Sequence, residues 1–223
     1  ITGLFNGRGV ALSRELQKVA VEQSPHGIPL IFAADIIHGM TTIFPIPMAE
    51  AASFDPELSR RTNRAAAVEA TANAIHWTFS PAVDVVRDQR WGRSAEAAGE
   101  DTWLACQFAT ARVQGFQGPD LKAPDSILAC LKHFAAYGAV EAGMDYNTVE
   151  ITEPTLRQTH LPSFKAGIDA GALTVMSAFN DIGGVPSTGN HKLLIDILRG
   201  EMGFKGFVVS DFTSEEELIA HGF

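Results

Sequence analysis

The sequence predicts an α/β fold in which helices surround parallel strands, as in a (β/α)8 TIM-type barrel. Five apolar runs have the length of strands, and segments with helical periodicity or helix-capping residues follow them. The runs are almost continuously apolar, which is typical of strands covered by helices on both faces. The 223 residues lie near the lower end of the length range of such barrels. We therefore expect an irregular or incomplete barrel, without its last strand and helix.

Each predicted strand has a polar or charged residue at or near its C-terminal end. The five runs are 28–35 (IPLIFAAD), 77–84 (WTFSPAVD), 127–134 (ILACLKHF), 173–180 (LTVMSAFN) and 206–211 (GFVVSD). The helical segments between them imply right-handed crossover connections. The strands that a closed barrel would still need are either short, as around 43–48 (IFPIPM), or absent from the chain.

Capping residues mark the starts of the helices. Asp55, Pro56 and Glu57 combine an N-cap, a proline at the first helical position and an acid in the first turn, which predicts an alanine-rich helix toward Ala72. Further helices are expected from Asp101 to Gly115, over 153–171, over 193–198 after an Asn190 cap, and after Thr213, which forms a capping box with Glu216.

The composition excludes several classes of protein. The chain has 26 acidic and 17 basic residues and a formal charge of −9, whereas a nucleic-acid binder needs clustered positive charge. Hydrophobic residues make up 46% of the chain, which is enough for a sizeable core. No run of about 18 apolar residues occurs, so we expect no membrane span, and residues 1–9 lack the regions of a signal peptide.

The sequence contains no recognisable metal or cofactor motif. Cys106 and Cys130 have no CxxC spacing, and the histidines show no HExxH pattern. The nucleotide-binding patterns GxGxxG and GxxxxGKS are also absent. We therefore expect neither a metal nor a cofactor.

The polar residues at the strand ends predict a binding site. In parallel α/β folds the carboxyl ends of the strands meet at one edge, where active sites form. Carboxylates, basic groups and amides around an apolar mouth suit a neutral polyhydroxylated ligand, whose hydroxyls can donate and accept hydrogen bonds. These strand-end residues are Asp35, Asp84, Lys132, His133, Asn180 and Asp211.

Each candidate also has a purely structural interpretation. Asp211 stands at a strand end, where a nucleophilic carboxylate would be rigidly held, but it could equally cap the next helix. Lys132 and His133 could close a strand at the solvent. Arg87, Arg90 and Arg93 could fork onto ligand hydroxyls, or could pair with the acidic residues Glu96, Glu100 and Asp101 of the same loop.

Five motifs in order resemble a known family. The segments IPLIFAADIIHG, TFSPAVDVVRDQRWGRSAEAAGED, LKHFAAYG, TVMSAFNDIGGVPSTGN and GFKGFVVSDF look like the N-terminal catalytic domain of glycoside hydrolase family 3, and most closely its bacterial β-glucosidase branch. The resemblance covers nearly the whole chain, so we interpret residues 1–223 as one such barrel domain, truncated at its C-terminus. Members of the family are expected to be periplasmic or secreted.

The resemblance implies roles for individual residues. Asp211, in VVSDF, matches the nucleophile of a retaining mechanism. Asp35, Arg93, Lys132 and His133 match the residues that bind sugar hydroxyls, which leaves the loop ion-pair interpretation for Arg87 and Arg90. Phe79, Met176 and Phe212 match apolar walls around the sugar ring, and Phe179 stands where many members have a tyrosine, so that a hydroxyl near the nucleophile would be missing.

The resemblance also implies a missing acid. In the glucosidase members a Glu from a second α/β domain protonates the leaving oxygen, and here 223 − 211 leaves 12 residues after Asp211. Glu215 is too ordinary in a first helical turn to be assigned. Another branch, the β-N-acetylglucosaminidases, carries its acid/base on an Asp-x-His loop, but the corresponding GAVEAGMDYNTVE has no such histidine. We expect the acid/base Glu and its domain to be supplied outside this chain.

The functional hypothesis is therefore a retaining β-glycosidase. We expect a β-glucosidase that removes terminal non-reducing β-D-glucosyl residues from oligosaccharides or from aryl and alkyl glucosides, through a glycosyl-enzyme intermediate on Asp211. Alternatives are β-xylosidase specificity, a sugar-binding half that is catalytically incomplete without a partner segment, and an unrelated barrel enzyme such as an aldolase with a Schiff base on Lys132.

Overall fold

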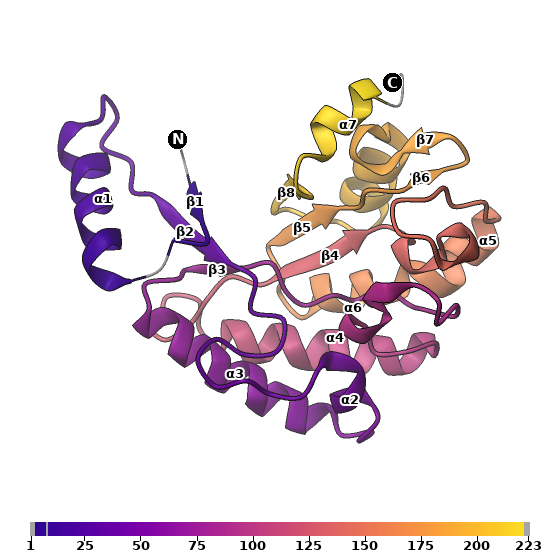
Figure 1. The fold of residues 1–223 in the computed structure, drawn as a ribbon, viewed down its shortest axis with the longest axis horizontal. Coiled ribbons are helices and arrows are strands. Elements are labelled where there is room, and N and C mark those ends of the chain that lie inside the picture. The colour runs from indigo at the N-terminus through magenta and orange to yellow at the C-terminus, as the bar shows by residue number, and fades with distance from the viewer. Residues whose placement is uncertain (1–2, 8, 221–223) are drawn as a thin grey trace.

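The computed structural model describes residues 3–7 and 9–220, so both ends of the predicted domain 1–223 lie outside the described residues. Parallel strands form a curved array with helices along its outer side (Figure 1). The first strand and α1 stand at one end of this array, and the last strand and α7 stand at the other. Among the described residues, no helix combines the length and the apolar character needed to cross a membrane.

Six parallel strands make up the array. They are β1 (Gly3–Phe5), β2 (Ile31–Ala34) and β3 (Trp77–Thr78) in one sheet, and β4 (Cys130–Phe134), β5 (Thr174–Ser177) and β8 (Phe207–Ser210) in a second. Parallel bridges from Trp77 to Leu128 and from Ala82 to Lys132 connect the two sheets. A separate antiparallel pair, β6 (Asp181–Ile182) and β7 (Val185–Pro186), forms a small hairpin beyond β5.

Helices alternate with these strands. The α-helices are α1 (Val10–Gln23), α2 (Pro47–Ala51), α3 (Pro56–Ala72), α4 (Thr102–Gln117), α5 (Glu153–Thr155), α6 (Pro162–Asp169) and α7 (Ser214–Ala220). Shorter 3₁₀ turns cover Gly92–Glu96, Tyr137–Ala139, Glu141–Gly143 and Ser187–Gly189, and π-helical segments cover Leu156–His160 and Lys192–Glu201.

The predicted α/β class is confirmed, and each of the five apolar runs contains a strand. The described residues show six parallel strands in an open array, and no closed eight-stranded barrel is seen in 3–7 and 9–220. The strand considered around 43–48 is wrong, because Pro47 starts α2 there instead. Proline suits a first helical position, since its fixed φ and missing N–H cost nothing at that point.

Three predicted caps form, and a fourth does not. The carboxylates of Asp55 and Asp101 accept hydrogen bonds from the N–H groups of Leu58 (3.1 Å) and Leu104 (2.7 Å), and Asn190 Oδ1 accepts from Leu193 N (3.0 Å). The capping box at Thr213 is wrong. The Thr213 φ of 60° lies in the left-handed region, and its hydroxyl donates to the Phe212 carbonyl instead.

The helix expected over 153–171 is confirmed, but it is interrupted by a π-helical turn. Pro162 has no N–H, so it cannot continue the regular pattern of bonds to the residue four positions back. The Leu161 N–H donates to the Leu156 carbonyl, five residues back, at 3.0 Å. The wider turn before Pro162 therefore joins α5 to α6 without a break in the chain direction.

Helices α3 and α4 pack closely against each other outside the strands (Figure 1). Ala66, Ala67 and Ala70 of α3 are buried, and their small side chains allow α4 to approach. At Gly115 of α4, a Cβ atom would lie 2.6 Å from the Arg60 carbonyl oxygen and 2.8 Å from the Asn63 Cβ. This helix crossing therefore has no room for a side chain at position 115.

We predict that Gly115→Ala destabilises the domain by about 1–3 kcal/mol, the usual cost of overpacking, because α3 would have to move away. Denaturant unfolding of the complete protein measures the effect. The matched control is Gly200→Ala, where the added Cβ would lie 3.6 Å from its nearest neighbour, the Ile195 carbonyl oxygen. An equal loss of stability in both variants would contradict the predicted steric cause.

Candidate functional site

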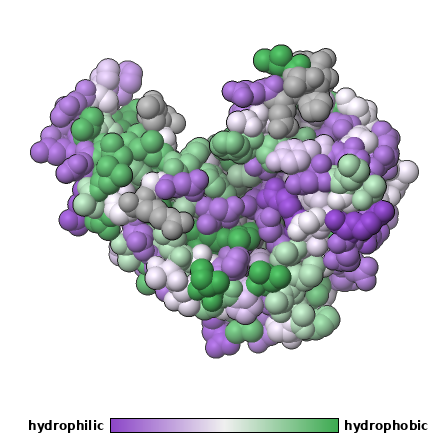
Figure 2. All heavy atoms as spheres, in the orientation of Figure 1, coloured by the Kyte–Doolittle hydropathy of each residue, from purple (hydrophilic) through white to green (hydrophobic). Residues whose placement is uncertain are grey.

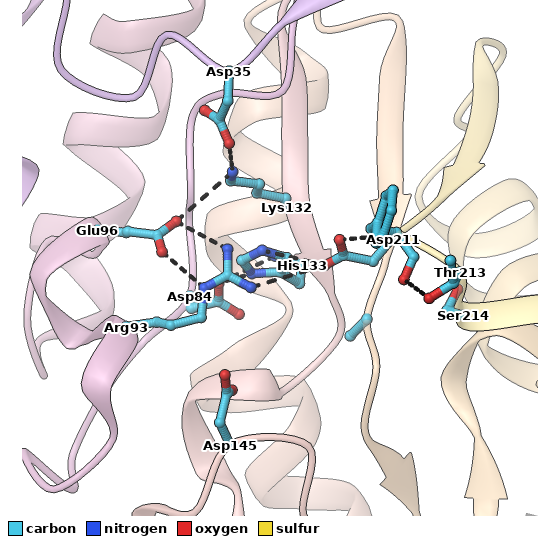
Figure 3. Close-up of polar contacts among 12 residues, drawn as sticks. Asp35, Asp84, Arg93, Glu96, Lys132, His133, Asp145, Asp211, Thr213 and Ser214 are labelled. Carbon is cyan, nitrogen blue, oxygen red and sulfur yellow. Dashed lines mark hydrogen bonds and ion pairs between the residues drawn. The ribbon is translucent and has the colours of Figure 1, made fainter. Parts of the chain in front are cut away.

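The ends of the parallel strands bring the predicted site residues together (Figure 3). Asp35 directly follows β2, Lys132 and His133 lie in β4, and Asp211 directly follows β8. Arg93 comes from the 3₁₀ turn that precedes α4. Strands that are far apart in the sequence therefore place four polar side chains at one edge of the array, as the strand-end pattern predicted, and the 3₁₀ turn adds Arg93.

Seven of the nine residues predicted for the site line one pocket of about 420 Å³. They are Asp35, Phe79, Arg93, Lys132, Met176, Asp211 and Phe212. The surface is hollowed between the two ends of the array, with hydrophilic and hydrophobic residues side by side on its walls (Figure 2). The pocket thus combines charged groups with apolar walls.

Lys132 is a buried cation between two carboxylates. Its Nζ lies 2.6 Å from Asp35 Oδ2 and 3.7 Å from Glu96 Oε2, and its side chain is 2% exposed. Asp35 Oδ1 also accepts a hydrogen bond from the Ser80 hydroxyl (3.1 Å). The alternative that Lys132 closes a strand at the solvent is therefore wrong, because a buried ammonium requires the partners it has here.

Arg93 pairs with Glu96 and also faces the nucleophile candidate. Its Nε and Nη2 donate to the two Glu96 carboxylate oxygens at 2.7 and 3.1 Å, and its Nη1 lies 3.9 Å from Asp211 Oδ2. Burial would raise the pKa of Glu96, but the Arg93 hydrogen bond and the Lys132 charge outweigh burial and lower it. Arg90, by contrast, forms a surface ion pair within the loop, but its partner is Asp88 (2.6 Å) and not one of the predicted partners Glu96, Glu100 and Asp101.

His133 is fully buried and bound by Asp84. A single carboxylate oxygen, Asp84 Oδ2, accepts from the His133 backbone N–H (3.1 Å) and contacts the His133 Nδ1 (2.9 Å). Burial raises the pKa of Asp84 to about 7. Burial, followed by the Arg93 and Lys132 charges, lowers the pKa of His133 to about 3, so the imidazole is neutral at neutral pH.

The two carboxylate oxygens of Asp211 differ. Oδ1 accepts the Phe212 N–H at 2.7 Å. Oδ2 is buried and has no hydrogen-bond partner among the described residues, although Arg93 Nη1 (3.9 Å) and His133 Nε2 (3.6 Å) face it. The side chain does not cap α7, because the Ser214 N–H is taken by the Asp211 backbone carbonyl instead (3.1 Å).

Aromatic side chains form the apolar part of the pocket. Phe79 packs edge-on against Phe5 of β1, with ring centroids 5.1 Å apart, and against Trp77 at 4.9 Å. Met176 lies on β5 in the same wall. Phe212, next to Asp211, is 85% exposed at the pocket mouth. Such rings and thioethers offer flat apolar surfaces to the C–H faces of a ligand.

Phe179 and Asn180 lie away from the pocket lining. The Phe179 ring packs against Tyr146 and Tyr137, with ring centroids 4.5 and 6.1 Å apart. The Asn180 side chain is buried and donates to the Ala135 carbonyl at 3.3 Å. His133 is likewise not a lining residue, and its ring lies between Asp84 and Asp211 (Figure 3).

Sequence reasoning missed three residues of the site. Glu96, which binds both cations, was considered only as an ion-pair partner in a surface loop. Phe5, the last residue of β1, and Asn6, which follows it, also line the pocket, and β1 is a strand of three residues that is too short to show a periodic pattern. The sequence signal for the end of this strand was the asparagine itself. Asn6 has a φ of 57°, in the left-handed region that asparagine tolerates better than most residues. Across residues 3–7 and 9–220 no cluster suited to a metal ion occurs.

This fold and pocket define a class of protein. A parallel α/β array with a carboxylate at a strand end, cations beside it and apolar walls is an arrangement in which enzymes with parallel α/β folds bind polar ligands. The chain belongs to glycosyl hydrolase family 3, because the family profile described as "Glycosyl hydrolase family 3 N terminal domain" matches residues 4–223.

Similar proteins come from several organisms. The chain is 44% identical over 209 residues to a periplasmic beta-glucosidase of Salmonella typhimurium, covering 94% of this chain and 27% of that protein. It is 40% identical over 206 residues to a putative beta-xylosidase of Formosa agariphila, covering 89% and 27%. The crystal structure of a beta-glucosidase from Listeria innocua in complex with glucose matches with a TM-score of 0.97 and 45% identity, covering 99% and 31%. The chain thus spans less than a third of each of these relatives.

A second buried histidine lies near Asp84. His160 ends the π-helical turn, is 5% exposed, and has its pKa lowered to about 4 by burial. In an unfolded chain the ordinary value is 6.5. Because the folded state resists protonation, the stability associated with neutral His160 is complete above pH 6.5 and is lost as the pH falls toward 4.

The free energy of unfolding of the wild type should fall as the pH is lowered from 6.5 to 4. We predict that His160→Gln makes this slope shallower by up to about 1.4 kcal/mol per pH unit, which is the contribution of one proton. Urea unfolding of wild type and variant across this range measures it. His191→Gln is the control, because His191 is exposed. An unchanged pH dependence in His160→Gln would show that His160 is not the group responsible.

Proposed function

We propose that this chain carries the nucleophile half of a retaining β-glycosidase, with Asp211 as the nucleophile. The observation that carries the proposal is the position of Asp211, which lines the pocket at the end of β8 and whose buried Oδ2 has no hydrogen-bond partner among the described residues and lies 3.9 Å from the Arg93 guanidinium. No hydrogen bond from the described residues has to be broken before that oxygen attacks a substrate.

The substrate proposed is a terminal non-reducing β-D-glucosyl residue of a short oligosaccharide or of an aryl or alkyl glucoside. The Listeria innocua enzyme, whose fold is so similar, was crystallised with glucose and, as a mutant, with laminaribiose. In this chain Asp35 would accept from sugar hydroxyls, and Lys132 and Arg93 would donate to them. Phe79 and Met176 would pack against the apolar face of the ring.

The reaction would proceed in two displacements. Asp211 Oδ2 attacks the anomeric carbon, the bond to the leaving oxygen breaks, and an acid transfers its proton to that oxygen. A glycosyl ester on Asp211 results. The same acid, now a base, removes a proton from water, which attacks the anomeric carbon and returns the electron pair of the ester bond to Asp211. Two inversions restore the original β configuration.

The acid/base is proposed to come from outside this chain, as a Glu of a second α/β domain. In retaining enzymes the two carboxyls stand about 5–5.5 Å apart, and the acid must hold a proton. Three carboxyls of the described site are each committed to another group. Asp35 is paired with Lys132, Glu96 is held ionised by Arg93 and Lys132, and Asp84 is buried against His133.

A second candidate specificity is a β-xylosidase. The Formosa agariphila relative, at 40% identity, is described as a putative beta-xylosidase. Glucose and xylose differ only by a hydroxymethyl group, which a pocket of about 420 Å³ could contain. Comparing kcat/KM for 4-nitrophenyl β-D-glucoside and β-D-xyloside distinguishes the two, and we propose that the glucoside is preferred because the Salmonella typhimurium relative and the Listeria innocua structure are both β-glucosidases.

We predict that Asp211→Ala in the complete protein lowers kcat on an aryl β-glucoside by at least about 10³-fold, because no carboxylate remains to form the ester. Azide added to this variant should restore turnover and give the α-glycosyl azide, since a small anion can enter the vacated space and attack once. Asp169→Asn is the control, a surface carboxylate paired with Lys165. More than a tenth of wild-type activity in Asp211→Ala would refute the proposal.

We predict a second result for the 223-residue chain on its own, once circular dichroism shows that it folds. Without the acid, it should fail on alkyl glucosides, whose leaving oxygen must be protonated. Relative to the complete protein, it should lose far less activity on 2,4-dinitrophenyl β-glucoside than on alkyl glucosides, because the dinitrophenolate departs without a proton. Turnover of alkyl glucosides at the rate of the complete protein would place the acid within residues 1–223. Binding of glucose without turnover of either substrate would favour the sugar-binding half instead.

A further inference from the structure

The His133 imidazole lies between two carboxylates (Figure 3). On one side, Asp84 Oδ2 is 2.9 Å from Nδ1, and on the other, Asp211 Oδ2 is 3.6 Å from Nε2. His133 Nε2 and Asp211 Oδ2 are both buried atoms with no hydrogen-bond partner in the described part of the chain. The two unsatisfied atoms therefore face each other inside the site.

The position of the single proton on the His133 ring explains why Nε2 and Asp211 Oδ2 do not form a hydrogen bond. An ionised Asp84 can only accept, so the short contact to Nδ1 requires a proton on Nδ1. The ring carries no second proton, because it is buried and because the Arg93 and Lys132 cations oppose another positive charge despite the carboxylates of Glu96 and Asp211. Nε2 is then a bare lone pair, which cannot donate to Asp211.

We infer that Asp84 is a positioning residue that keeps the His133 proton on Nδ1 and so prevents Nε2 from donating a hydrogen bond to the nucleophile. The inference rests on the proposed role of Asp211. Asp84 also binds the His133 backbone N–H through the same oxygen (3.1 Å), so its carboxylate fixes the backbone, the ring orientation and the tautomer together.

The opposite tautomer would hinder the reaction. With the proton on Nε2, the imidazole would donate to Asp211 Oδ2, and a hydrogen bond to a carboxylate is among the stronger ones in proteins. That oxygen would have to give up the bond as it attacks the anomeric carbon, which adds to the barrier.

The tautomer can be measured directly, without turnover. In the complete protein labelled with ¹⁵N-histidine and held at pH 8, where Asp84 is ionised, NMR should show a protonated Nδ1 and a bare Nε2 for His133. The signal is assigned by its loss in His133→Phe. In Asp84→Ala the ring should gain the Nε2-protonated form. A wild-type His133 protonated on Nε2, or on both nitrogens, overturns the inference whether or not Asp84→Ala folds.

A double-mutant cycle tests the effect on the reaction. Asp84→Ala should lower kcat/KM for an aryl glucoside by about ten- to a hundredfold when His133 is present, and by less than about twofold in a His133→Ala background. Equal losses in both backgrounds would assign Asp84 a general structural role and overturn the inference. The structural control is Ser163→Ala, which removes a buried hydrogen bond to the Val83 carbonyl, next to Asp84 (2.6 Å). This control should leave the tautomer unchanged.

The two proposals fail in different ways. If the proposed function is wrong, Asp211→Ala keeps its activity, while the His133 tautomer still follows Asp84. If the inference is wrong, Asp211→Ala is inactive, but the tautomer or the cycle gives the contrary result.

Discussion

The buried ammonium of Lys132 is the interaction on which the rest of the site depends. Removing a cation from water costs several kcal/mol unless carboxylates compensate it. Asp35 from the end of β2 and Glu96 from the turn before α4 provide that compensation, at 2.6 and 3.7 Å. Glu96 in turn binds Arg93, which faces Asp211 at the end of β8. Charges of alternating sign thus run from one sheet to the other, and each holds the next in place.

Much of the site was predictable because parallel strands impose a simple rule. Residues that end apolar runs converge at one edge, so Asp35, Lys132 and Asp211 could be grouped without any knowledge of their distances. The sequence did not predict how many oppositely charged side chains each charged residue would contact. Glu96 stands three residues after Arg93, a spacing that usually marks an exposed pair, and only the fold brings Lys132 beside it.

The local errors in predicting the fold have physical causes as well. The three residues of β1 are too few to show a period, and prolines changed two other elements. Pro47 turned an apolar run into the start of a helix, and Pro162 widened a helical turn into a π-helix. Threonine is a residue type that often caps helices, but Thr213 has a left-handed φ, because of the path that the chain takes from β8 to α7. The pattern of residues therefore predicted the α/β class and the positions of the helices better than it predicted the hydrogen bonds at the helix ends.

The unequal oxygens of Asp211 bear on the second half of the proposed reaction. When the ester forms through Oδ2, Oδ1 becomes its carbonyl oxygen and keeps the Phe212 N–H that it has in the free protein (2.7 Å). When water then displaces the sugar, the carboxylate is the leaving group, and this peptide hydrogen is already in place to stabilise the charge that returns to it. The same hydrogen bond makes the carboxylate a slightly weaker attacker in the first step. In the proposed reaction one backbone amide would therefore set the balance between formation and breakdown of the intermediate, and no side-chain substitution at position 212 removes it except proline.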